Sequence, residues 1–144
     1  MGADKEKRTH NGIIFDSKME MEYYRDVVCP GVESGLIKQY ELQKKYELQP
    51  KFVRDGKTVS AITYVADFYI EYNDGREEVI DIKGCPDSVA KIKRKMFWAV
   101  YPDKDYKWLS YVKKYGGWVE YERLKVLRRE DKRAKKLKEE PENG

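Results

Sequence analysis

Residues 58–84, TVSAITYVADFYIEYNDGREEVIDIKG, contain the pattern that decides the fold. β-Branched and aromatic residues fill 58–72 and recur in 78–83, and such residues favour strands. Asp74-Gly75 lies between the two runs, and this dipeptide is typical of a tight hairpin turn. The stretch therefore predicts two neighbouring antiparallel strands.

Helix signals lie before and after these strands. Ser17-Lys18-Met19-Glu20 has the spacing of a capping box, in which a short side-chain oxygen accepts from free first-turn N–H groups. Pro86-Asp87-Ser88 is a second helix start. Strands with helices before and after them predict an α/β (α+β) fold, with a mixed central sheet flanked by helices. The other predicted elements are helices over 17–28, 88–101 and 120–138 and strands over 48–53 and 105–109, while 36–46 fits either helix or strand.

The length of 144 residues suits one domain. We expect this domain to span residues 11–138, with 1–10 as a disordered leader and 139–144 as a disordered tail. No apolar run approaches the roughly 18–20 residues that a membrane helix needs. No secretory signal is visible at the start of the chain either. A soluble, cytoplasmic protein is expected.

The cysteines and the histidine exclude several kinds of chemistry. Cys29 and Cys85 are far apart, and His10 is the only histidine, so a zinc site lacks ligands. His10 falls in the predicted leader, which argues against a Ser-His-Asp or Cys-His centre. We expect two reduced thiols.

The charge distribution is uneven along the chain. Residues 1–83 contain 13 basic and 16 acidic side chains, whereas residues 84–139 contain 17 basic and 8 acidic ones. A basic half of this kind is typical of nucleic-acid binding, although many Lys-rich helices are simply solvated. The candidates for contacts with a DNA backbone are Lys91, Lys93, Arg94 and Lys95.

Three residues in the central strands carry candidate chemistry. Asp67 lies in a run of apolar and aromatic residues, where a carboxylate is costly unless it is paired or binds a metal. Asp81 and Lys83 are two apart in a strand, so they point to the same face. If the Asp74-Gly75 turn pairs the strands, the carboxylates of Asp67 and Asp81 converge and repel each other. The sequence therefore predicts a divalent cation between them.

Mg²⁺ suits such a pair, because it accepts a few carboxylates and keeps several waters for substrate phosphate. The backbone carbonyl of Ile82 would add an oxygen ligand. A bound cation polarises a phosphate and lowers the pKa of a bound water, while Lys83 would stabilise charge on the phosphate or orient the hydroxide. The plainer interpretation of Asp81 and Lys83 is a surface ion pair, which contributes about 0–1 kcal/mol.

The order of an acid, a gap and Asp-x-Lys resembles the signature of the PD-(D/E)XK nuclease superfamily. Ala66 stands where that family usually has Pro, and Asp81 where it more often has Glu. Over residues 10–102 the chain resembles a phage and prophage family of small nucleases described as a domain of unknown function. The layout is also similar to phage endonuclease I-type Holliday junction resolvases and TnsA-type transposon endonucleases. The matching segments are Asn11-Gly12-x-x-Phe15-Asp16-Ser17-Lys18-x-Glu20, Glu47-Leu48-Gln49-Pro50-Lys51-Phe52, Tyr64-x-Ala66-Asp67-Phe68, Asp81-x-Lys83-Gly84 and Lys93-x-Lys95-x-Phe97.

The resemblance implies a restriction-endonuclease-like sheet flanked by helices, dependence on Mg²⁺ or Mn²⁺, and hydrolysis that leaves a 5′-phosphate. It also implies a helical acid at Glu20. Glu22 competes for this role, since residues two apart on a helix face different sides, and Glu20 could instead complete the capping box. Gln49 could orient a water, contact a phosphate or be a structural amide.

The expected function is a Mg²⁺-dependent DNA endonuclease. A structure-selective enzyme that cuts Holliday junctions or other branched DNA during phage DNA metabolism would act as a homodimer, because a junction needs two coordinated cuts. The long closing helix could supply the contact between copies. The alternatives are a sequence-specific or partner-directed endonuclease of restriction or transposase type, and a nucleic-acid-binding module without catalysis.

Overall fold

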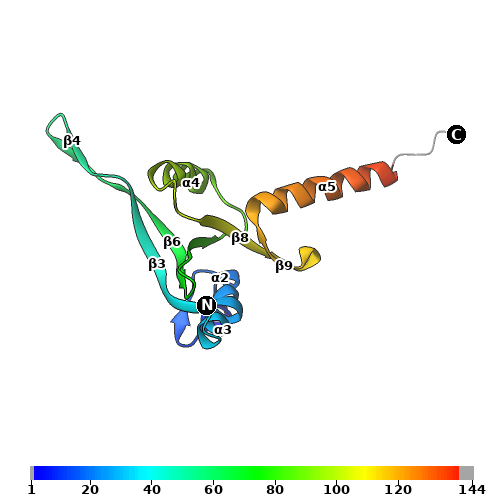
Figure 1. The fold of residues 1–144 in the computed structure, drawn as a ribbon. Coiled ribbons are helices and arrows are strands. Elements are labelled where there is room, and N and C mark those ends of the chain that lie inside the picture. Colours follow the sequence, from blue (N-terminus) through cyan, green and yellow to red (C-terminus); the bar gives the residue numbers. More distant parts are fainter. Residues whose placement is uncertain (1, 140–144) are drawn as a thin grey trace.

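Five strands form one mixed sheet in the computed structural model, which describes residues 2–139 (Figure 1). β7 and β8 run parallel, and the other neighbouring pairs are antiparallel. This mixed sheet with flanking helices confirms the predicted fold class. In order across the sheet, the strands are β3 (Ile37–Gln49), β6 (Ile62–Tyr72), β7 (Glu77–Ile82), β8 (Tyr106–Val112) and β9 (Gly117–Glu120).

Two core clusters hold the helices against the sheet. One lies under α2 (Lys18–Tyr23), the π-helix η1 (Tyr24–Val28) and α3 (Cys29–Glu33), and includes Phe68 and Ile80. The other lies under α4 (Ser88–Val100) and includes Ala66 and Phe97. These helices occupy opposite sides of the sheet in Figure 1. Since Ala66 belongs to one cluster and Phe68 to the other, Asp67 lies where β6 passes between the two cores.

The described residues of the segment predicted as a disordered leader have secondary structure. Residues Gly2–Lys7 form α1, and β1 (Thr9–His10) pairs with β2 (Ile13–Ile14). Asn11 and Gly12 both have positive φ, 51° and 76°, as a tight two-residue hairpin turn requires. The Arg8 guanidinium also donates to the Phe15 carbonyl at 2.8 Å. The hairpin therefore ties the chain start to the core beside Phe15.

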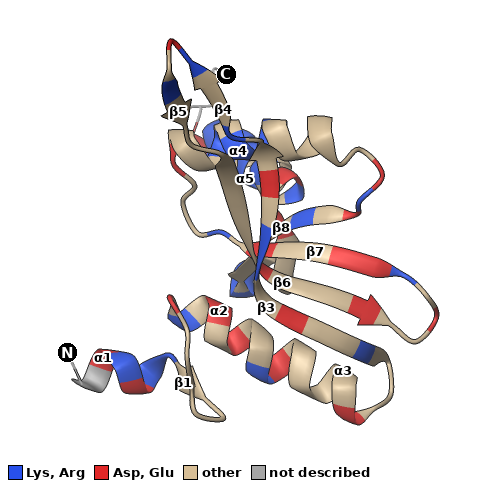
Figure 2. Cartoon of the chain, turned by 90° about the vertical axis from the view of Figure 1, so that its left-hand side faces the viewer, with Lys and Arg blue, Asp and Glu red and all other residues tan. Residues whose placement is uncertain are grey.

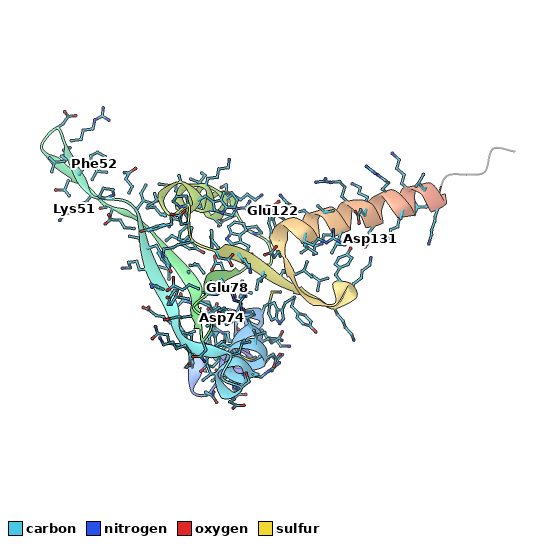
Figure 3. All side chains as sticks on the ribbon, in the orientation of Figure 1. Lys51, Phe52, Asp74, Glu78, Glu122 and Asp131 are labelled. Atoms are coloured by element: carbon cyan, nitrogen blue, oxygen red, sulfur yellow. The ribbon has the colours of Figure 1, made fainter. Side chains whose placement is uncertain are left out.

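The ambiguous segment over 36–46 is a strand, because it pairs along its length with β6. Beyond it, β4 (Phe52–Arg54) and β5 (Lys57–Val59) form a second hairpin that projects from the sheet (Figure 1). Its turn is Asp55-Gly56, as predicted, with φ of 51° and 74°. The labelled Lys51 and Phe52 in Figure 3 mark where this projection begins.

The first helical segment continues beyond Val28, where the sequence predicts its end before Pro30. The backbone N–H of Cys29 donates to the Tyr24 carbonyl, five residues back, which is a π-type bond. In a regular α-helix the ring of Pro30 would clash with the carbonyl four residues earlier. A π-turn widens the helix at this point, so the chain stays helical to Glu33.

The C-terminal part adds a strand that the sequence did not predict. After β8, the short helix η2 (Lys113–Tyr115) leads through Gly116 to β9, and α5 (Tyr121–Glu139) follows. β9 has only four residues and begins at Gly117, so its sequence shows too little alternation of apolar and polar residues to predict a strand. Glu139 closes α5, and the rest of the predicted tail lies outside the described residues. None of the described helices is both long and apolar enough to cross a membrane.

Candidate active site

The ladder between β6 and β7 opens at the two predicted aspartates. Backbone pairing ends at Phe68 and Ile80, so the next position sets Asp67 opposite Asp81. There the side chains replace the ladder bonds. The Asp67 N–H donates to Asp81 Oδ1 at 3.2 Å, and the Ile82 N–H donates to Asp67 Oδ2 at 2.8 Å. The structure therefore brings both carboxylates between the two strands, next to Ile82.

The position of Lys83 distinguishes this Asp-x-Lys from a solvated ion pair. Lys83 follows the end of β7, and its backbone N–H donates to the Leu109 carbonyl of β8 at 2.8 Å. Its Nζ lies 2.8 Å from Asp81 Oδ2. Asp81 is only 2% exposed, and within residues 2–139 its Oδ2 forms the ion pair with Lys83 but no hydrogen bond. The Lys83 ammonium also lies 5.5 Å from the centre of the Trp108 ring.

Glu20 enters the site from α2. The Ser17 hydroxyl accepts from the Glu20 N–H at 3.0 Å and caps the helix. The Glu20 side chain does not complete a capping box, because it is buried and accepts from the Gln43 amide at 2.9 Å. Glu22 instead lies 3.8 Å from Lys18 in a surface ion pair. Of the two candidate helical acids, the structure brings Glu20 to the aspartates.

Gln43 is the site residue that the sequence did not reveal. It lies in β3 opposite Asp67, and its Nε2 donates to Glu20 Oε1 at 2.9 Å and to Asp67 Oδ1 at 3.4 Å. Its φ of 54° is rare for a residue with a side chain, and such strain concentrates at functional sites. The predicted accessory residue, Gln49, lies opposite Ile62. That is five residues from Asp67 along β6, roughly 16 Å at a strand rise of about 3.3 Å.

The charges of the site raise the pKa of two carboxyls. Burial raises the pKa of Glu20 to about 7, and the charges of Asp16 and Asp81 add to this effect. Burial, together with the charge of the neighbouring Asp81, raises the pKa of Asp67 to about 9. Without a cation, these two carboxyls therefore tend to hold protons near neutral pH.

The donor chemistry of the site fits a hard divalent cation. Asp67, Asp81 and Glu20 supply carboxylate oxygens, and Ile82 a carbonyl, which are the ligand types that Mg²⁺ takes. The buried Asp81 Oδ2, which pairs with Lys83 but forms no hydrogen bond in the described part of the chain, is a candidate ligand. Within residues 2–139 no three Asp, Glu, His or Cys side chains are already arranged as a closed ligand cluster. Gln43 stands between Glu20 and the aspartates, so Glu20 would join such a site through a shift of this amide.

The raised pKa of Asp67 predicts how stability depends on pH. Between the ordinary carboxyl pKa near 4 and about 9, the folded state binds more protons than the unfolded state, so stability falls as pH rises. Asn carries no charge and its oxygen can still accept from Ile82. We expect Asp67→Asn to raise the Tm of the metal-free protein at pH 8 by about 3 °C or more, and by less at pH 5.

Thermal unfolding followed by circular dichroism, in a chelator at both pH values, measures this difference. Asp103→Asn, at an exposed position, is the control and should leave the Tm unchanged at either pH. An Asp67→Asn effect of equal size at pH 5 and pH 8 would contradict the raised pKa.

The predicted DNA contacts on α4 do not all face solvent. Lys91 and Lys95 are exposed, and Lys93 is half-buried. The side chain of Arg94 is only 14% exposed. It pairs with Glu122 at 3.0 Å and stacks on the Trp108 ring at 4.1 Å. Arg94 therefore joins α4 to β8 and α5, and Lys91 and Lys95 are the better placed for backbone phosphates.

A family model described as "Protein of unknown function (DUF1064)" matches residues 3–117. The chain belongs to the DUF1064 family. The DUF1064 match includes Glu20, Gln43, Asp67, Asp81 and Lys83 and ends before α5. A search of curated proteins finds no match to this chain.

Proposed function

We propose that this chain is a metal-dependent DNA endonuclease that hydrolyses phosphodiester bonds. One observation carries the proposal: Asp67 and Asp81 meet where the β6–β7 ladder opens, with the Lys83 ammonium 2.8 Å from Asp81. Asp81 is buried and Asp67 half-buried, and with Lys83 they form a polar centre between the two core clusters. The basic residues gathered over α4 and α5, seen in Figure 2, suit a polyanionic substrate.

Asp67, Asp81, the Ile82 carbonyl and Glu20 would hold Mg²⁺ or Mn²⁺, which supplies polarisation of the scissile phosphate and a lower pKa for a bound water. The protein's own residues hold the carboxylates in place and stabilise the charge on the phosphate. Lys83 lies beside Asp81 and stabilises negative charge that develops on the phosphate. The backbone N–H groups of Asp67 and Ile82 hold the two carboxylates in place, so little reorganisation is needed when substrate binds.

We further propose a structure-selective enzyme of phage or prophage DNA metabolism, acting on Holliday junctions or other branched DNA in the cytoplasm of the host cell. A homodimer would supply the two cuts that a junction needs. Exposed apolar residues support a contact between copies. They lie on α4 at Val89 and Ile92 and on the projecting hairpin at Phe52 and Val53.

A cleavage panel tests the proposal. Purified protein should cut four-way or branched DNA with Mg²⁺ or Mn²⁺ and should be inactive in a chelator. Equal rates on linear duplex and on junctions would remove the structure-selective reading and favour a cutter whose site is chosen by sequence or by a partner protein. Binding without cleavage of any DNA, with either metal, would favour a non-catalytic nucleic-acid-binding module.

Gln43 gives a more specific prediction. We expect Gln43→Ala to reduce the cleavage rate by about 10- to 100-fold, as is typical when a residue that orients metal ligands is lost. The Gln43 amide lowers the pKa of Glu20, so its loss should also move the pH profile of cleavage to higher pH. Gln39→Ala is the matched control, because Gln39 lies on the same strand and its amide bonds to Glu71. A lower rate with an unchanged pH profile would count against this role.

A further inference from the structure

Among the described residues, α5 carries a strong excess of positive charge. Its 19 residues, YERLKVLRREDKRAKKLKE, include nine Lys or Arg and four Asp or Glu. Leu124 is its one buried residue, and the helix extends away from the sheet in Figure 1. A helix that is polar on nearly every side is stabilised by a partner or by many favourable ion pairs.

Favourable pairs do not explain α5. Basic residues recur four apart in it, and like charges at this spacing destabilise a helix. Such spacings are Arg128 with Lys132, Arg129 with Arg133, and Lys132 with Lys136. A polyanion laid against the helix would remove this repulsion. A second copy of α5 would increase it, and Ala134 and Leu137 are the only apolar residues after Leu127, too few for a coiled-coil seam.

One side of α5 forms a groove with the η2 turn. The α5 groove has a volume of about 400 Å³. Asp131 forms an ion pair there with Lys114 at 2.6 Å and accepts a hydrogen bond from the Tyr115 hydroxyl. Figure 3 labels its place on the helix. Within residues 2–139, none of the remaining three cations of the groove forms an ion pair. The charged and hydrogen-bonding residues that line it are Lys114, Tyr115, Arg128, Asp131, Lys132 and Lys135.

We propose that the α5 groove binds backbone phosphates of duplex DNA flanking the cut, an assignment of DNA that rests on the proposed function. Asp81 is in register with Trp108, whose ring lies 5.5 Å from that of Tyr121 at the start of α5. At about 1.5 Å per residue, Arg128 and Lys135 lie roughly 10 and 21 Å further along the helix. These distances fall within one turn of B-DNA, about 34 Å.

The test compares two faces of the same helix. The groove variant is Arg128→Gln/Lys132→Gln/Lys135→Gln, and the control is Arg129→Gln/Arg133→Gln/Lys136→Gln. Each removes three positive charges, and Gln is a good helix former, so circular dichroism should show equal helix content. Binding of a labelled 30-base-pair duplex is measured by fluorescence anisotropy in a chelator, which separates binding from cleavage, over a series of salt concentrations.

We expect the groove variant to bind about tenfold or more weakly at 150 mM salt. The slope of the logarithm of the binding constant against the logarithm of the salt concentration should become shallower by about 2–3, since each lost phosphate contact removes about 0.9. The control should lose less than about threefold, with a slope change below about 1. Equal losses of duplex affinity in both variants, or no loss in the groove variant, would contradict phosphate binding by the α5 groove.

The proposed function fails on different evidence. If the parent protein cuts no DNA with Mg²⁺ or Mn²⁺ but duplex binding is lost only in the groove variant, phosphate binding by the α5 groove is supported and the nuclease function is rejected. If the groove variant cleaves DNA at the full rate and binds duplex with unchanged affinity, the nuclease function is supported and phosphate binding by the α5 groove is rejected. α5 lies beyond the residues matched by the DUF1064 model, so the groove is proposed for this chain and not for the family.

Discussion

Asp81→Asn should abolish cleavage of branched DNA in Mg²⁺, with a fall of about a thousandfold or more. The change keeps the shape of the side chain and an oxygen that can accept from the Asp67 N–H. It removes the negative charge beside Lys83 and can replace the buried Oδ2, a candidate ligand for a cation, by an amide nitrogen. A thousandfold loss corresponds to about 4 kcal/mol of transition-state stabilisation, within the several kcal/mol that metal-ion catalysis supplies.

The chain contains its own control for this substitution. Asp105-Tyr106-Lys107 is a second Asp-x-Lys, on the strand next to β7, and Lys107 Nζ lies 3.5 Å from Asp105. Asp105→Asn should cut at the parental rate, because this carboxylate is exposed and lies away from Asp67. Rates are measured in single-turnover assays at saturating protein, and duplex binding in a chelator should be unchanged in both variants. Cleavage that persists in Asp81→Asn would contradict the assignment of the active site.

Lys83→Met should reduce cleavage by about 100-fold or more, with little change in duplex affinity. Met keeps the length and apolar stem of the side chain and removes the ammonium, so the loss reports the charge beside Asp81. Removing one preorganised group that stabilises developing charge typically costs 10²–10³ in rate. Lys83→Arg should recover part of the rate, since the positive charge returns with a different shape.

Lys107→Met is the matched control for Lys83, because Lys107 pairs with Glu78 and Asp105 and not with the candidate site. Tryptophan fluorescence checks the local structure, since the Lys83 ammonium lies 5.5 Å from the Trp108 ring. The assigned role of Lys83 is excluded if Lys83→Met and Lys107→Met lose the same amount of activity.

Local signals were enough to predict much of the fold. Asn11-Gly12, Asp55-Gly56 and Asp74-Gly75 predict hairpin turns, and φ is positive at Asn11 and Asp55 and at all three glycines. Ser17 and Asp87 predict helix starts, and both side chains accept from an N–H three residues on. These features depend on a few neighbouring residues. The convergence of Asp67 and Asp81 could be predicted for a related reason, because one short turn fixes the register of their strands.

Features that depend on distant parts of the chain could not be predicted. Gln43 reaches the site because β3 pairs with β6 at one register and because its φ is positive, and neither leaves a local pattern. In the sequence, Arg94 looks like the other basic residues of α4. Only in the folded structure does it meet its partner, Glu122 of α5. Spacing alone does not separate Asp81-x-Lys83 from Asp105-x-Lys107. Burial separates them, and burial is a property of the whole sheet.

The open ladder between β6 and β7 gives the two aspartates a second task. Each accepts a strand N–H that would otherwise need a partner in the sheet, so both contribute to strand pairing whether or not the chain cuts DNA. A descendant of this chain that lost its activity would still be under pressure to keep a side-chain oxygen at both positions, as Asp or Asn, for strand pairing. The Lys83 ammonium cannot accept from a strand N–H, so it does not contribute to strand pairing in this way. In chains that have lost activity, we therefore expect Lys83 to be replaced first. Its presence or absence is therefore the better guide to which related chains remain active.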